Sequence, residues 1–95
     1  MKAVMLAHVT IKDQKQFAAY AEASAPSLEA AGAKFVLRGK INSVLAGEHP
    51  HNIMAVIEFT DIASLTKWYN SEEYQKIIPL RNQAADVTFI SYEVA

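Results

Sequence analysis

A stretch of nine residues, 3–11, limits the possible folds most, because it is apolar on both faces of a strand. On alternating positions Val4 and Leu6 fall on one face, whereas the other face carries Ala3, Met5, Ala7 and Val9. Residues 53–59 repeat this pattern until Glu58. Strands of this kind are covered on both sides in folded proteins. The sequence therefore predicts a sheet with two buried faces.

Two further segments have strand patterns. Residues 34–38 form a second strand, which residues 39–40 interrupt with a bend or bulge before it resumes over 41–45. A turn is expected at 47–52 from its composition. Residues 87–94, rich in β-branched and aromatic side chains, close the chain as the last strand.

Helical patterns fill the two longer gaps between strands. Asp13 is placed as the N-cap of an amphipathic helix of about five turns. Pro26 inside this helix predicts a kink or a restart, because proline removes one backbone hydrogen bond, and Gly32 predicts its left-handed end.

The second helical region begins after Asp61, which is placed as an N-cap. Ser71 is expected to cap a further helical segment, with acidic residues in its first turn. Pro79 predicts another break.

The resulting order is strand, helix, two hairpin-linked strands, helix, strand. This order predicts an α+β fold of the ferredoxin-like βαββαβ type, in a single domain over residues 1–95. The sheet is expected to be four-stranded and antiparallel, with both helices on one face. Two helices leave the other apolar face open to water, which is costly. We therefore expect a homodimer in which two sheets pack face to face as a dimeric α/β barrel.

Composition excludes several classes of function. The 95 residues carry a net charge of -1, and their nine Lys and Arg are scattered, so nucleic acid is not an expected partner. The absence of cysteine excludes disulfides, thiolate nucleophiles and cysteine-type metal centres. No apolar run is long enough for a membrane span or a signal peptide. A cytoplasmic protein without a membrane partner is expected.

The segment 68–81 concentrates groups that both stack and hydrogen-bond. Trp68, Tyr69 and Tyr74 are candidates for the walls of a pocket that orients a planar or carbonyl-bearing ligand, with Ser71 beside them. The alternative is that they pack a short helix on the sheet. Arg81 falls on the same helical side as Tyr74.

The two arginines each allow two interpretations. Arg81 would bind a carboxylate in bidentate fashion, either that of a ligand or that of Glu58 in an internal ion pair. Arg38 allows the same two interpretations, and the glycine beside it lets the backbone approach closely.

Two residues are candidates for proton transfer. Glu58 follows a run of apolar residues, where a carboxylate is disfavoured in its charged form unless paired. His8 stands near the end of a buried strand, and either abstracts a proton from a substrate or is a hydrogen-bonded structural residue. His49 and His51 lie close in sequence, but without an evident third ligand a solvated loop explains them better than a metal site. No metal or cofactor is expected.

The motifs Arg38-Gly39, Glu58-Phe59, Trp68 to Tyr74 and Arg81 together resemble those of the domain-of-unknown-function family numbered thirteen-thirty. The resemblance covers nearly the whole chain. It implies membership of the dimeric α/β barrel superfamily, which includes cofactor-independent monooxygenases, muconolactone isomerases and stress-responsive proteins. Where relatives usually have a second glycine this chain has Lys40, and where they usually have Glu-Gly it has Ala46-Gly47.

Two functions are compatible with these observations. In the first, a cavity between helices and sheet binds a small carbonyl-bearing or aromatic metabolite. In the second, the protein is a cofactor-independent enzyme of monooxygenase or isomerase type, in which Glu58 or His8 is the acid or base and an arginine stabilises developing negative charge.

Overall fold

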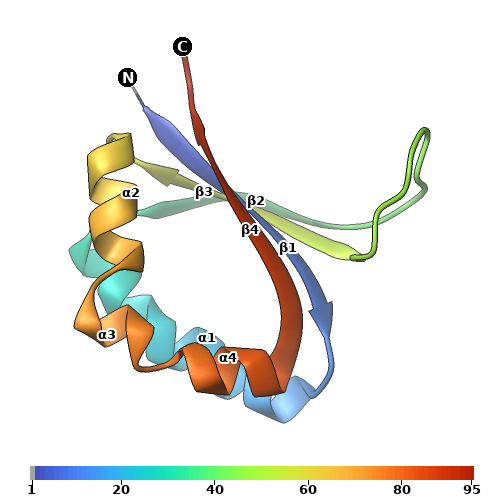
Figure 1. Cartoon of the computed structure of the whole chain (residues 1–95), viewed down its shortest axis with the longest axis horizontal. Helices are drawn as coiled ribbons and strands as arrows, with labels where there is room; N and C mark the ends of the chain where they lie inside the picture. Colours follow the sequence, from blue (N-terminus) through green and yellow to red (C-terminus); the bar gives the residue numbers. More distant parts are fainter. Residues whose placement is uncertain (1) are drawn as a thin grey trace.

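The computed structural model describes residues 2–95, and it places a four-stranded antiparallel sheet beneath a layer of helices that covers one face (Figure 1). The sheet has the order β2-β3-β1-β4. Its strands are β1 (Ala3–Ile11), β2 (Lys34–Lys40), β3 (Ile53–Phe59) and β4 (Ala85–Glu93). The predicted α+β ferredoxin-like fold is confirmed.

Four helices form the second layer: α1 (Gln14–Ala30), α2 (Ile62–Tyr69), α3 (Glu72–Gln75) and α4 (Ile78–Ala84). Asp13 caps α1 as expected, because its carboxylate accepts from the backbone N–H of Gln16 at 2.9 Å. Gly32, with φ of 73°, follows the end of α1 in the left-handed region. The expected restart at Pro26 is wrong, since α1 is one helix from end to end.

The second helical region is divided into three short helices. Ser71 caps α3 by accepting from the backbone N–H of Tyr74 at 3.2 Å. Pro79 lies in the first turn of α4, where its missing N–H costs no helical hydrogen bond. The break expected there is therefore a helix start. Because α3 and the short connections on either side of it link α2 to α4, the side chains of Tyr69, Tyr74 and Arg81 come together.

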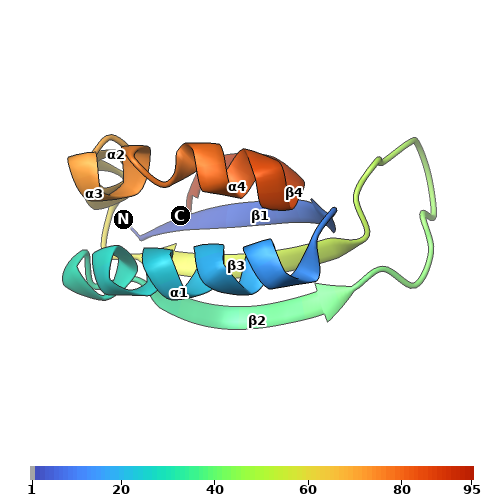
Figure 2. The same cartoon turned by 90° about the horizontal axis from the view of Figure 1, so that it is seen from below.

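The hairpin between β2 and β3 differs from the prediction in two ways. The register shift in β2 lies between Phe35 and Leu37, not at residues 39–40. The strand does not resume over 41–45, because β3 begins only at Ile53 and leaves those residues without a partner strand. The segment 41–52 instead extends beyond the end of the sheet (Figures 1 and 2).

Alternation along the strands gives the sheet an inner face, under the helices, and an outer face. In β1 the inner residues are buried, and these are Ala3, Met5, Ala7 and Val9. In β3 the corresponding inner residues include Ile57 and Phe59, which are also buried. Together with Tyr20 and Leu28 of α1 and with Leu65 and Trp68 of α2, they form the core.

The outer face is apolar as well, and no helix of the described chain covers it. Its centre pairs Leu6 of β1 with Val56 of β3 and Ile90 of β4. Leu37 and Tyr92 continue this surface and are about half exposed, at 51% and 46%. None of the helices described here has the length and apolarity needed to cross a membrane. The predicted surplus of apolar sheet surface is therefore present.

Candidate functional site

A hydrogen-bonded chain of tyrosines and one arginine lies between the helical layer and the sheet. Tyr74 of α3 is fully buried, and its hydroxyl is hydrogen-bonded to that of Tyr20 on α1 at 2.7 Å. The same hydroxyl accepts from Nη1 of Arg81 at 3.0 Å. Burial raises the pKa values of Tyr20 and Tyr74, so both hydroxyls keep their protons at neutral pH.

Arg81 extends this series of hydrogen bonds beyond Tyr74. Its side chain is buried, and Nη1 also donates to the hydroxyl of Tyr69 at 3.3 Å. Nε and Nη2 approach Oδ1 of Asn82 at 3.4 Å each, and the guanidinium carbon lies 5.2 Å from the centre of the Phe89 ring. Burial acts to lower the pKa of Arg81, but its hydrogen bonds to Tyr69 and Tyr74 outweigh that effect and raise it. The guanidinium is therefore charged.

This charge has no carboxylate partner within residues 2–95. The two ion pairs in that range join Lys2 to Glu58 and Lys12 to Asp86. Of the two interpretations of Arg81, the internal pair with Glu58 is not present, because Glu58 faces the outer side of the sheet and pairs with Lys2. A buried cation whose hydrogen-bond partners are all neutral has no opposite charge to offset the cost of its desolvation.

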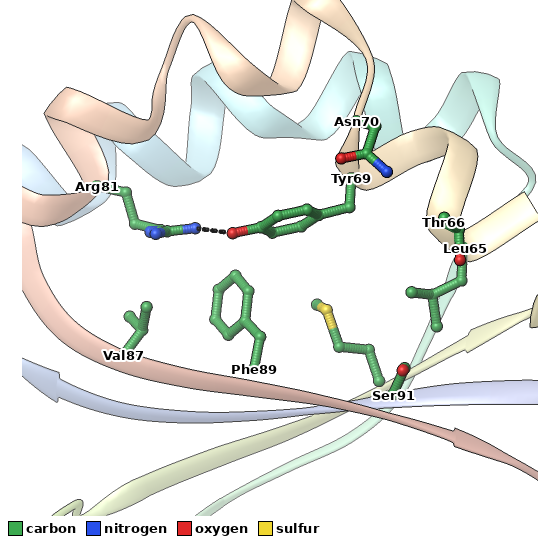
Figure 3. A pocket seen from close by; sticks show the side chains of 9 residues that line it. Leu65, Thr66, Tyr69, Asn70, Arg81, Val87, Phe89 and Ser91 are labelled. Carbon is green, nitrogen blue, oxygen red and sulfur yellow. Dashed lines mark hydrogen bonds between the residues drawn. The ribbon is translucent and has the colours of Figure 1, made fainter.

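A cavity of about 390 Å³ adjoins the guanidinium, and we call it the arginine pocket (Figure 3). It lies between α2, α4 and the inner face of the sheet. In Figure 3 Tyr69 and Arg81 form the wall on the helical side, whereas Val87 and Phe89 rise from β4 opposite them. The remaining lining residues are Met5, Leu65, Thr66, Asn70 and Ser91. The pocket thus offers one cation, a few neutral polar groups and aromatic surface.

Trp68 and Ser71 lie near this network but do not line the arginine pocket. Trp68 is buried and donates from Nε1 to Oγ of Ser27 at 3.1 Å, while its ring centre lies 5.5 Å from that of Phe59. It packs α2 on α1 and the sheet, as the structural alternative predicts. Ser71 acts as the cap that orients Tyr74.

Arg38 lies at a different cavity. Its guanidinium stacks over the ring of Phe35 at 4.1 Å, and both residues are exposed on edge strand β2. They line a second cavity, of about 300 Å³, which extends beneath α1. Arg38 and Arg81 therefore line different cavities and do not share a binding site.

Glu58 and His8 point away from both of these cavities. Because Ile57 and Phe59 face inward, Glu58 faces outward, and its carboxylate lies 3.3 Å from Nζ of Lys2. His8 likewise alternates with buried Ala7 and Val9 on β1. Neither residue therefore faces the space between helices and sheet, and proton transfer by Glu58 or His8 stays a prediction.

The structure also gathers three histidines on the outer face. The ring of His49 is 4.8 Å from that of His8 and 5.6 Å from that of His51. Both ring nitrogens of His51 are engaged, with hydroxyls of Thr10 and Thr88 at 3.0 Å each. Within residues 2–95 no group of three or more potential ligands is arranged to hold a metal ion.

Several members of the site were missed in the sequence. Tyr20 lies in the expected amphipathic helix and Phe89 in the expected last strand, but neither was predicted to be a site residue. Both stand at positions of the expected period, so the signal for a buried location was present. Their neighbours were not predictable, because Tyr20 and Tyr74 are separated by 54 residues.

Solved structures share this fold over nearly the full chain. A protein of unknown function from Rhodopseudomonas palustris, RPA0582, superposes with a TM-score of 0.81 at 22% identity, over 99% of this chain and 82% of that one. SnoaB, a cofactor-independent oxygenase from Streptomyces nogalater, gives 0.67 at 8% identity, over 99% and 93%. A dimeric ferredoxin-like protein of unknown function from Thermobifida fusca gives 0.62 at 8% identity, over 99% and 92%. At these identities the likeness is one of fold.

No curated protein matches the sequence. The family comparison, by contrast, is nearly complete along the chain. The model of the family described as "Domain of unknown function (DUF1330)" matches residues 2–94, and the chain belongs to that family.

Proposed function

We propose that this protein binds a small aromatic or carbonyl-bearing compound with an anionic oxygen group in the arginine pocket, as a homodimer. The observation that carries the proposal is the buried guanidinium of Arg81, which is charged, lines a cavity and has only neutral hydrogen-bond partners. A ligand carboxylate or enolate would supply the missing negative charge. The ring of Phe89, beside the guanidinium, supports a planar ligand by stacking.

Binding without turnover is better supported than acid–base catalysis. The nine residues that line the pocket include no histidine, aspartate, glutamate or lysine. A general base must lie within hydrogen-bond reach of the proton that it removes. Glu58 and His8, the two candidates, lie on the outer face. The enzymatic alternative, in which Arg81 and Tyr69 stabilise an enolate, would need a base that the ligand or water supplies.

Calorimetric titration with benzoate and with benzamide tests the proposed charge recognition. The two compounds have similar shape, but only benzoate is anionic at neutral pH. Benzoate is expected to bind, and Arg81→Gln should weaken it about 10- to 100-fold, since hydrogen bonds to charged groups contribute about 1.5–3 kcal/mol. Tyr69→Phe keeps the guanidinium and should weaken it less. Lys67→Gln, at an exposed lysine of α2, is the charge-matched control.

Equal affinity for benzoate and benzamide would contradict the proposal, as would full benzoate affinity in Arg81→Gln. Circular dichroism of each variant shows whether the fold survives. If Arg81→Gln does not fold, Tyr69→Phe and the comparison of the two ligands still decide the question.

The dimer is supported by surface area. A folded monomer of 10.5 kDa is expected to expose about 5,400 Å², whereas this chain exposes 6262 Å². The difference, about 860 Å², is close to what one partner buries in a standard interface. We expect the dimer interface on the apolar outer face around Leu6, Val56 and Ile90, where two sheets would pack across a two-fold axis.

Sedimentation at micromolar concentration tests the dimer. Ile90→Glu puts a charge at the centre of the outer face and should give a monomer. Ala63→Glu, on the exposed side of α2, should leave the dimer intact. A wild-type monomer, or a dimeric Ile90→Glu variant, would contradict sheet-to-sheet packing. A cytoplasmic location remains the prediction made from the sequence.

A further inference from the structure

We propose that the ligand of the arginine pocket is an elongated amphipathic acid, whose carboxylate binds Arg81 and whose apolar body extends beneath α1. This inference rests on the proposed function and adds the size and chemistry of the rest of the ligand. It starts from the second cavity, of about 300 Å³, which we call the apolar pocket. A cavity of this size lies at the lower end of the range for ligand sites.

The apolar pocket continues the arginine pocket. Met5, Val87 and Phe89 line both cavities, so these side chains form a wall that the two cavities share. Phe89 is also the residue whose ring lies 5.2 Å from the guanidinium carbon of Arg81. A molecule anchored at Arg81 and extending past Phe89 therefore enters the space between α1 and the strands.

Among the described residues, the buried polar side chains that line the apolar pocket are already hydrogen-bonded. The hydroxyl of Tyr20 is already hydrogen-bonded to that of Tyr74, and Oγ of Ser24 donates to the carbonyl of Ala21 at 3.1 Å. The other deep lining residues are apolar, among them Ala7, Val9, Leu28 and Ala55. A polar substituent placed here would lose its hydration without compensation. The part of the ligand that lies beneath α1 is therefore hydrocarbon.

Arg38 sits at the opposite end of this space. It stacks on Phe35 at 4.1 Å, and both are exposed on β2 at the edge of the sheet. An exposed guanidinium is well hydrated and gains little from a carboxylate. Arg81, which is buried and has neutral partners, gains more. The acid therefore points to Arg81, and the apolar end points towards the Phe35 side.

Titration of the protein with straight-chain carboxylates from acetate to decanoate tests the inference. Once the chain passes Phe89, each added methylene should tighten Kd about fourfold, as full burial of a CH2 group predicts. Binding should also change the fluorescence of Trp68, the single tryptophan, which lines the apolar pocket. Arg81→Gln should weaken all chain lengths by a similar factor.

Two variants fill the apolar pocket from opposite walls. Ala25→Phe projects from α1, and Ala55→Phe projects from β3. Each should remove the gain with chain length while leaving acetate and benzoate affinity unchanged. Ala19→Phe, at an exposed position of α1 that lines neither pocket, is the matched control and should keep the gain. With two filling variants, misfolding of one still leaves the test decisive.

The outcomes separate the two proposals. If benzoate and the short acids bind through Arg81 but affinity does not rise with chain length, the extended ligand is refuted and the proposed function stands. The same holds if both filling variants keep the gain. If Arg38→Gln weakens octanoate more than Arg81→Gln does, the orientation is refuted. If no carboxylate binds at all, both proposals fail.

Discussion

Replacement of Tyr74 by phenylalanine would test whether the buried hydrogen-bond chain stabilises the fold. The ring would stay, but its hydroxyl joins Tyr20 at 2.7 Å and accepts from Arg81 at 3.0 Å. A neutral hydrogen bond contributes about 1 kcal/mol and one to a charged group about 1.5–3 kcal/mol. Arg81 keeps its bonds to Tyr69 and Asn82, which places the sum towards the lower end. We expect a loss of about 2–3 kcal/mol in the free energy of unfolding.

Tyr20→Phe is the matched comparison for this change. The Tyr20 hydroxyl has one partner, Tyr74, so its removal should cost only about 1 kcal/mol. Urea unfolding followed by circular dichroism measures both variants at equal protein concentration, since the stability of the proposed dimer would depend on concentration. With slopes of about 1–3 kcal/mol per molar, Tyr74→Phe should lower the midpoint by about 0.7–3 M. A Tyr74→Phe midpoint as high as that of Tyr20→Phe would refute the reasoning.

Three further predictions concern single residues. Burial and the nearby His49 and His51 lower the pKa of His8, so its contribution to stability is complete above the unfolded value of 6.5 and is lost as pH falls from there through the lower pKa of the folded state. His8→Gln should therefore flatten the decline of urea midpoints between pH 7.5 and 5. Burial raises the pKa of Tyr20, so stability should fall as pH rises above 10.0, and less steeply in Tyr20→Phe when melting is followed from pH 9 to 11. Ser27→Ala removes the acceptor of the Trp68 indole and should cost about 1–2 kcal/mol, seen as a lower Tm in thermal unfolding.

The periodicity of the sequence was sufficient for the fold. Apolar alternation located β1 and β3, and the caps at Asp13, Asp61 and Ser71 located three helix starts, because these signals depend on residues only a few positions apart. The end of β2 was placed wrongly because a strand ends where its partner ends. β2 therefore ends opposite the first residue of β3, and the composition of residues 41–45 does not show where β3 begins.

The candidate site was predicted in part. Tyr69, Tyr74 and Arg81 come together because they lie on consecutive short helices, within reach of local reasoning. The face on which Glu58 lies could not be predicted, for a different reason. Both faces of β3 are apolar, so alternation shows that Glu58 faces away from Ile57 and Phe59 but does not show which face the helices cover. If the helices covered the other face of β3, Glu58 would point towards them.

The histidines of the outer face show the same limit at a longer range. His49 and His51 were expected in a solvated loop, and His8 at the end of a strand. The segment 41–52 turns back so that His51 joins Thr10 and Thr88 across β1 and β4. An irregular segment has no period, and its path is determined by contacts that a sequence pattern does not encode.

The partners of Arg81 explain why a stable protein keeps a buried charge in a cavity. An internal carboxylate would neutralise the guanidinium but would also occupy the place of a ligand. Tyr69, Tyr74 and Asn82 instead satisfy its N–H groups with neutral oxygens, which hold the side chain in position and leave its charge uncompensated. Desolvation of that charge opposes folding, and an anion that enters the pocket offsets the same cost. Folding and the proposed binding are thus linked through one residue, since any ligand that neutralises Arg81 would also stabilise the folded chain.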